Sequence, residues 1–138
     1  MKKKLLVLVI VAMAIVAGQV HAQQWYPANQ VTLAWDPVAK VATTDQPNKY
    51  QVYMRTDLVS AGQKIAGEIT ANQLLISFTT EGRYYLGVEA IRYPQGETTG
   101  IPSSSKAWSN NAADTANKPF GVLFFTAPGS VSNIRLNP

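Results

Sequence analysis

YYLGVEAI, residues 84–91, decides the fold of this chain. Within it, Tyr84, Leu86, Val88 and Ala90 occupy every second position. Apolar residues that recur at every second position are typical of a β-strand with one buried face. The stretch therefore predicts a strand whose inward side chains are these four.

The same alternation recurs elsewhere in the 138 residues, and turn-forming residues such as Asp45-Gln-Pro-Asn48 and Tyr93-Pro-Gln-Gly96 separate the segments. The further strands expected are 31–35, 50–55, 74–78, 105–109 and 122–126. No segment keeps the three-and-four spacing of an amphipathic helix. Many short alternating strands predict an all-β protein, an antiparallel β-sandwich.

The first 22 residues have the pattern of a secretory signal peptide. Three lysines at 2–4 precede an apolar run at 5–17, and Val20-His21-Ala22 resembles a cleavage site. The run is shorter than the ~20 residues that a membrane-spanning helix needs. We therefore expect cleavage after Ala22, no membrane span afterwards, and a secreted product located in the periplasm or outside the cell.

Cleavage after Ala22 removes three lysines and the only histidine, and the chain has no cysteine. The formal charge then falls from +4 to +1, which removes the electrostatic case for binding nucleic acid. Without histidine or cysteine there is no serine or cysteine triad, no ordinary zinc site and no haem or iron–sulfur ligation. We expect no cofactor, no metal and no enzymatic activity.

The remaining catalytic option is a pair of carboxylates, as in glycosidases, which need two of them ~5–9.5 Å apart. Most of the acidic residues are expected in turns or on a solvent-facing side of a strand. Glu89 is expected to pair with Arg55 and Arg92 on neighbouring positions. Surface ion pairing accounts for these carboxylates better than catalysis does.

Four stretches together, in this order, resemble a fibronectin type III domain: VTLAWDPV (31–38), KYQVYMR (49–55), YYLGVEAI (84–91) and GETTGIPSSSKAW (96–108). Trp35 matches the tryptophan that packs at the centre of such domains. Tyr84 matches the tyrosine that begins the strand patterned Tyr-x-aliphatic-x-Val-x-Ala. The resemblance implies an immunoglobulin-like β-sandwich of the bacterial, exported kind.

Residues 23–126 are expected to form this domain, followed by a strand-like extension at 127–138. Fibronectin type III domains are mostly spacers and adhesion modules. By this analogy the chain is a non-catalytic protein-interaction or adhesion module, acting in the periplasm or at the cell surface.

One candidate surface for a protein partner lies on the outward registers of the expected strands. It consists of Tyr53, Tyr85, Ile91 and Tyr93. Exposed apolar patches often mark contacts between proteins. The alternatives are that these side chains pair across strands to stabilise the sheet, or that the C-terminal extension covers them.

A polysaccharide is the second partner class. A small carbohydrate-binding domain would stack sugar rings on aromatic side chains. The candidates for this role are Trp25, Tyr26, Tyr53, Tyr85 and Trp108.

The C-terminal extension resembles the opening strand of a fibronectin type III domain, at the wrong end of the chain. Only residues 23–30 precede the tryptophan strand, so the domain is expected to lack that opening strand and to leave an edge unfilled. Val131, Ile134 and Leu136 form the candidate edge strand. It would fill the edge of its own domain, enter the edge of a neighbouring copy and make the chain a self-assembling structural subunit, or serve as a linker or the remnant of a second domain.

Overall fold

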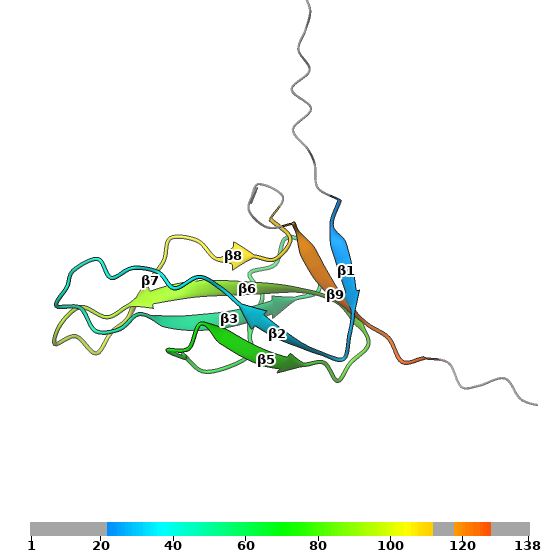
Figure 1. Cartoon of the computed structure of the whole chain (residues 1–138), viewed down its shortest axis with the longest axis horizontal. Coiled ribbons are helices and arrows are strands. Elements are labelled where there is room, and N and C mark those ends of the chain that lie inside the picture. Colours follow the sequence, from blue (N-terminus) through cyan, green and yellow to red (C-terminus); the bar gives the residue numbers. More distant parts are fainter. Residues whose placement is uncertain (1–21, 112–117, 128–138) are drawn as a thin grey trace, which may run out of the picture.

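The computed structural model describes residues 22–111 and 118–127, and over these residues the chain is all-β, with mostly antiparallel pairing and no helix (Figure 1). This confirms the all-β prediction. The strands are β1 (Gln24–Pro27), β2 (Gln30–Ala34), β3 (Lys49–Arg55), β4 (Gln63–Lys64), β5 (Gln73–Ser77), β6 (Gly82–Arg92), β7 (Ile101–Pro102), β8 (Ala107–Trp108) and β9 (Phe120–Phe124).

The long strand β6 organises the larger sheet, whose order is β1-β9-β6-β3-β4. Along one side β6 pairs antiparallel with the whole of β3. Along its other side it pairs in turn with β9, β8 and β7. The strand β1 is added beyond β9 and runs parallel to it, with Tyr26 opposite Val122.

The smaller sheet consists of β2 and β5, paired antiparallel with Leu33 opposite Leu74. Its inward side chains Leu33 and Ile76 belong to one buried cluster with side chains of the larger sheet. The full cluster is Leu33, Val52, Ile76, Phe78, Tyr84, Leu86 and Val122. The two sheets therefore share one hydrophobic core, to which β2, β3, β5, β6 and β9 contribute apolar side chains.

The four long alternating segments predicted from the sequence correspond to β2, β3, β5 and β6. The strand expected at 122–126 is β9, which begins two residues earlier at Phe120. The strands β1, β4 and β7 were not predicted. They have two to four residues each and are mostly exposed, so their sequences carry no clear alternation.

The family resemblance implied that Trp35 packs at the centre of the core. In the structure Trp35 lies at the edge of the core instead. It follows β2 directly and is only partly buried, with its ring 5.4 Å from that of Tyr50. The most buried large side chains are Leu86, Val52 and Val122, which are at most 1% exposed. Trp35 packs against this cluster from its edge because it also lines an open groove, described below.

Asp45 fixes the long loop between β2 and β3 to the end of β6. Its carboxylate accepts hydrogen bonds from Arg92 Nε at 2.7 Å and from the Ala42 backbone N–H at 3.0 Å. The expected pairing of Glu89 with Arg55 and Arg92 is wrong. Glu89 instead accepts a hydrogen bond from the Tyr53 hydroxyl at 2.7 Å.

Replacing Asp45 by asparagine is expected to destabilise the protein at neutral pH, with a loss that disappears in acid. The hydrogen bond from Arg92, and secondly that from Ala42, hold the pKa of Asp45 below its ordinary value. A lowered folded-state pKa stabilises the fold fully above the unfolded pKa of about 3.9, and this stabilisation is lost as the pH falls through the folded value. Melting temperatures of wild type and variant between pH 7 and pH 2 test this; a gap that stays constant would contradict it.

Candidate partner-binding groove

The four side chains predicted to form an exposed partner surface are buried. Their exposed fractions are 7% for Tyr53, 8% for Tyr85, 6% for Ile91 and 8% for Tyr93. They do lie on neighbouring positions of β3 and β6 and just after β6, as expected. Other segments of the chain cover this side of the sheet, so the expectation that it is exposed is wrong.

Trp25 of β1 and the segment before β8 provide part of this cover. The Trp25 ring lies 5.5 Å from the ring of Tyr85. The ammonium group of Lys106 lies 4.4 Å from the centre of the Tyr53 ring. Burial, and secondly the hydrogen bond to Glu89, raise the pKa of Tyr53 to about 12, so its hydroxyl stays a proton donor at neutral pH.

Ile91 and Tyr93 are covered at the other end of the sheet. Gly100 lies so close that a Cβ there would collide with both side chains. The Tyr93 hydroxyl donates a hydrogen bond to Glu68 at 2.6 Å, and this bond raises the pKa of Tyr93. Lys49 lies 4.4 Å above the ring and 3.8 Å from the Glu68 carboxylate. These polar contacts satisfy the hydroxyl and hold the cover in place.

The aromatic side chains suggested for sugar stacking do not form a common flat platform. Tyr53 and Tyr85 are buried, and Trp25 packs on Tyr85. The Trp108 ring packs on Gly87, and the guanidinium of Arg55 lies 3.8 Å from the ring centre. Tyr26 is 45% exposed. These five aromatic side chains therefore do not form the stacking surface that was expected, and a polysaccharide ligand stays a prediction.

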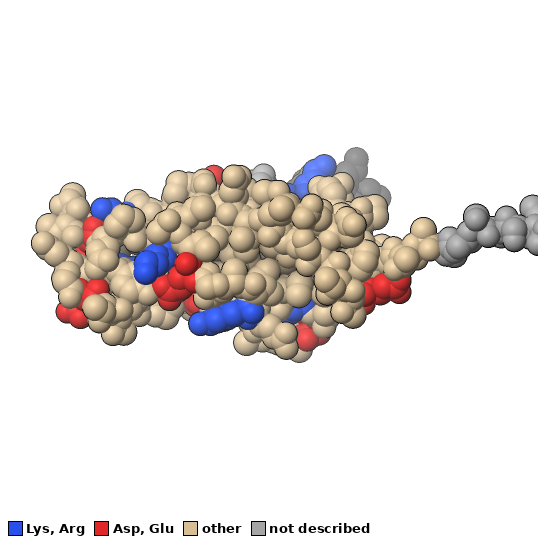
Figure 2. Space-filling view, turned by 90° about the horizontal axis from the view of Figure 1, so that it is seen from below, with Lys and Arg blue, Asp and Glu red and all other residues tan. Residues whose placement is uncertain are grey.

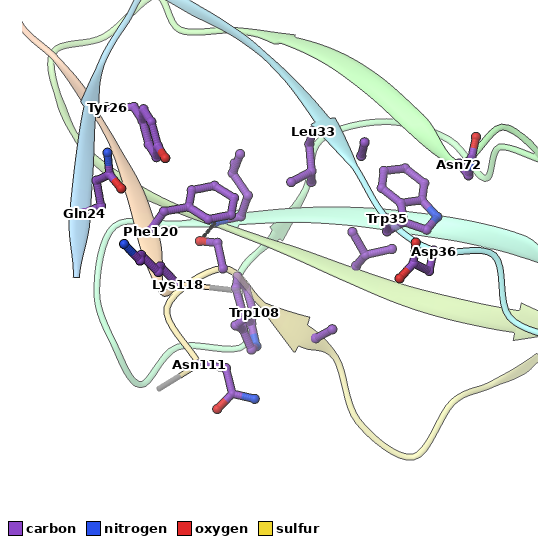
Figure 3. Close-up of a pocket in the computed structure, with 15 residues that line it drawn as sticks. Gln24, Tyr26, Leu33, Trp35, Asp36, Asn72, Trp108, Asn111, Lys118 and Phe120 are labelled. Atoms are coloured by element: carbon purple, nitrogen blue, oxygen red, sulfur yellow. Dashed lines mark hydrogen bonds between the residues drawn. The ribbon is translucent and has the colours of Figure 1, made fainter. Parts of the chain in front are cut away.

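A groove lies beside β2, on the side away from β5. Two adjoining hollows of about 770 Å³ and 460 Å³ make it up, and they share Tyr26, Leu33, Ala34, Leu86 and Phe120. Figure 3 shows Leu33 and Trp35 from the β2 segment, Phe120 from β9 and Tyr26 from β1 around the larger hollow. The groove therefore runs between the edge of the small sheet and the facing strands of the large one.

The backbone of β2 presents an edge to this groove. The Phe78 N–H donates a hydrogen bond to the Asn29 C=O, and the Trp35 N–H donates one to the Asn72 C=O. In residues 29–35 the odd-numbered residues are therefore the ones whose backbone groups bond toward β5. Because hydrogen-bonding directions alternate along an antiparallel strand, the N–H and C=O groups of Gln30, Thr32 and Ala34 point the other way. Among the described residues no strand pairs with this edge.

The floor of the groove is apolar, and polar side chains lie at both ends of its larger hollow. Leu33, Leu86 and Val122, all core residues, line its inner part. Polar residues lie at both ends of the larger hollow: Asp36 and Asn72 near Trp35, and Asn111 and Lys118 near Trp108 and Phe120 (Figure 3). An unpaired strand edge beside an apolar floor can accept an extended segment that adds backbone hydrogen bonds and inserts alternate side chains.

The sequence predicted an unfilled edge but did not identify the residues that form it. Val131, Ile134 and Leu136, the candidate strand to fill it, lie outside the described residues. The sequence feature that indicated an open edge was the short segment before β2, which we expected to be too short for an opening strand. That segment does contain a strand, β1, but β1 pairs with β9 and leaves the edge of β2 open.

The described ranges contain no cluster of three or more acidic, histidine or cysteine side chains suited to hold a metal ion. They also contain no helix that is long and apolar enough to cross a membrane. On the face shown in Figure 2, basic and acidic side chains are interspersed rather than gathered into one basic patch.

Comparison of the chain with protein-family models, with curated proteins and with solved structures finds no match.

Proposed function

We propose that residues 23–126 form an exported, non-catalytic β-sandwich of the fibronectin type III kind that binds a protein partner at the groove beside β2. The observation that carries the proposal is the edge of Gln30, Thr32 and Ala34, whose backbone groups are turned toward an apolar groove. A strand from a partner that pairs with this edge would form backbone hydrogen bonds with it. The same strand would cover the core residues that line the groove.

Two features support the immunoglobulin-like part of the proposal. The Tyr84 hydroxyl, near the start of β6, donates a hydrogen bond to the backbone C=O of Thr80. A tyrosine bonded back to the chain just upstream recurs at this corner of immunoglobulin-like sandwiches. The pairing of β3 and β6, and the packing of β2 and β5 against them through one core, also fit a two-sheet arrangement.

Site-specific cross-linking in the exporting cell tests the binding proposal. A photoreactive benzophenone side chain at Thr32, which is exposed on the open edge, should give a covalent adduct with a protein. The matched control is Val59, which is 92% exposed in a loop after β3 and should give none. Equal adducts at both positions, or none at Thr32, would overturn the proposal.

Mass spectrometry of the exported protein tests the proposed location. The small-residue pattern at 20–22 leads us to expect an N-terminus at Gln23, in part cyclised to pyroglutamate. The exported fraction should therefore lack the three lysines at 2–4. Recovery of the intact N-terminus from that fraction would contradict cleavage and favour a retained anchor.

A further inference from the structure

We infer that the partner at the groove beside β2 is a second copy of this chain, which inserts its residues 131–136. The inference rests on the proposed function, because it names the occupant of the same groove. Three observations support it: where the chain leaves the fold after β9, the sequence of the segment that follows, and the direction in which that segment can pair.

After β9 the chain leaves the described fold near one end of the groove. The backbone of the β1–β2 connection crosses this same end of the groove. Thr126 N–H bonds to the Glu81 carboxylate at 2.7 Å, which ties the end of β9 to the turn before β6 (Figure 1). Beside it, the connection from β1 to β2 passes between the sheets. In this connection Ala28 N–H bonds to Leu123 C=O at 3.1 Å, and Asn29 C=O accepts from Phe78 N–H at 2.8 Å.

This crossing stands between the end of β9 and the edge of β2. A segment that starts at Ala127 would have to pass outside the crossing and reverse its direction to enter its own groove. After that reversal it would run parallel to β2, because β9 and β1 point toward the start of β2. Parallel pairing is slightly less stable per residue than antiparallel pairing. A segment from another copy can approach antiparallel to β2.

The segment after Ala127 has the length and pattern of an inserted strand. Residues 128–138 number eleven, which extended would reach ~36 Å, against ~17 Å for the five residues of β2. Ile134 and Leu136 alternate with Arg135, so in an extended strand these two apolar side chains share one face and Arg135 lies on the other. Ile134 and Leu136 suit the apolar floor formed by Leu33 and Leu86. Residues 127–130 are then left to span the distance between two copies.

Insertion of this kind joins different surfaces of the two copies, because one contributes β2 and the other contributes residues 131–136. Such a heterologous contact does not close on itself at a dimer. The expected products are head-to-tail chains of copies whose length grows with protein concentration.

A complementation experiment tests the inference. Thr32→Pro removes an N–H from the open edge without removing a bond to β5, and so disables the acceptor. The double variant Ile134→Asp, Leu136→Asp disables the inserted segment. By sedimentation, the wild-type exported chain should form oligomers that grow with concentration, each variant alone should be monomeric, and an equal mixture should form a species of twice the monomer mass.

Leu75→Pro is the matched control for the acceptor variant. Leu75 lies opposite Thr32 on β5, and its N–H points away from β2, so this variant should assemble like wild type. If Thr32→Pro melts at a much lower temperature than Leu75→Pro, Ala34→Arg takes its place, because it puts a charge in the groove without changing the backbone.

A wild-type chain that stays monomeric at all concentrations would overturn the inference, as would a mixture of the two variants that forms no dimer. If the wild-type chain is a monomer and the double aspartate variant is less stable than the wild type, residues 131–136 fill the groove of their own domain. That result also overturns the inference. A photo-adduct of Thr32 with a different protein would leave the proposed function standing while this inference fails.

Discussion

Replacing Leu86 by alanine is expected to cost about 2–5 kcal/mol of the free energy of unfolding, the range for removing a large aliphatic side chain from a core. Leu86 is 1% exposed and lies on β6, where the core residues of both sheets meet. Domains of this size have total stabilities of about 5–15 kcal/mol, so the variant should be close to unfolding at room temperature. Urea unfolding followed by circular dichroism measures the change.

The matched control is the same substitution at Leu75, which is 58% exposed on β5. This change should stay within about 0.5 kcal/mol of wild type, as surface substitutions usually do. Equal losses at Leu86 and Leu75 would contradict the position of the core.

Replacing Gly87 by alanine is expected to destabilise the protein by about 1–3 kcal/mol, the cost of adding volume where there is no space. A Cβ at this position would lie 2.7 Å from Cε3 of Trp108. The ring has other close neighbours, since the Arg55 guanidinium lies 3.8 Å from its centre and a Cβ on Gly62 would lie 2.5 Å from its Cη2 atom. In a strand, alanine in place of glycine otherwise stabilises by roughly 0.5–1 kcal/mol, so the sign of the change is diagnostic.

Gly67 provides the control for this prediction. No heavy atom lies within 4 Å of where its Cβ would be, so Gly67→Ala should leave the stability unchanged or raise it slightly. Thermal unfolding of the two variants in the same buffer compares them directly. If Gly87→Ala were as stable as Gly67→Ala, the packing of Trp108 on β6 would be wrong.

The strands that alternation predicted are those whose inward face packs into the core. In β3 and β6 the positions of Tyr50, Val52, Tyr84 and Leu86 follow from period two alone, because one face of each strand is buried in the core. Such a pattern is local, so it can be read from one segment at a time.

The burial of the opposite face could not be predicted in the same way. Tyr53 and Tyr85 are covered by Lys106 and Trp25, which are far from them in the sequence. Nothing within β3 or β6 distinguishes an aromatic side chain covered by a distant segment from one open to solvent. The role of Gly87 is equally non-local, since it is set by Trp108 on the neighbouring strand.

The position of Trp35 and the open edge of β2 have a common physical reason. A family resemblance gives the order of strands but not which strand covers each edge. In this chain the first strand pairs with β9, so that Trp35 lines a groove and the N–H groups of Thr32 and Ala34 face it.

Amide hydrogen exchange at β2 tests most directly the claim that this edge pairs with a strand. In the wild-type chain without residues 1–22, at high concentration, the amides of Thr32 and Ala34 should exchange as slowly as those of Val31 and Leu33, which bond toward β5. In the double variant Ile134→Asp, Leu136→Asp, Thr32 and Ala34 should exchange rapidly while Val31 and Leu33 stay protected. Rapid exchange of Thr32 and Ala34 in the wild-type chain at every concentration would contradict the account.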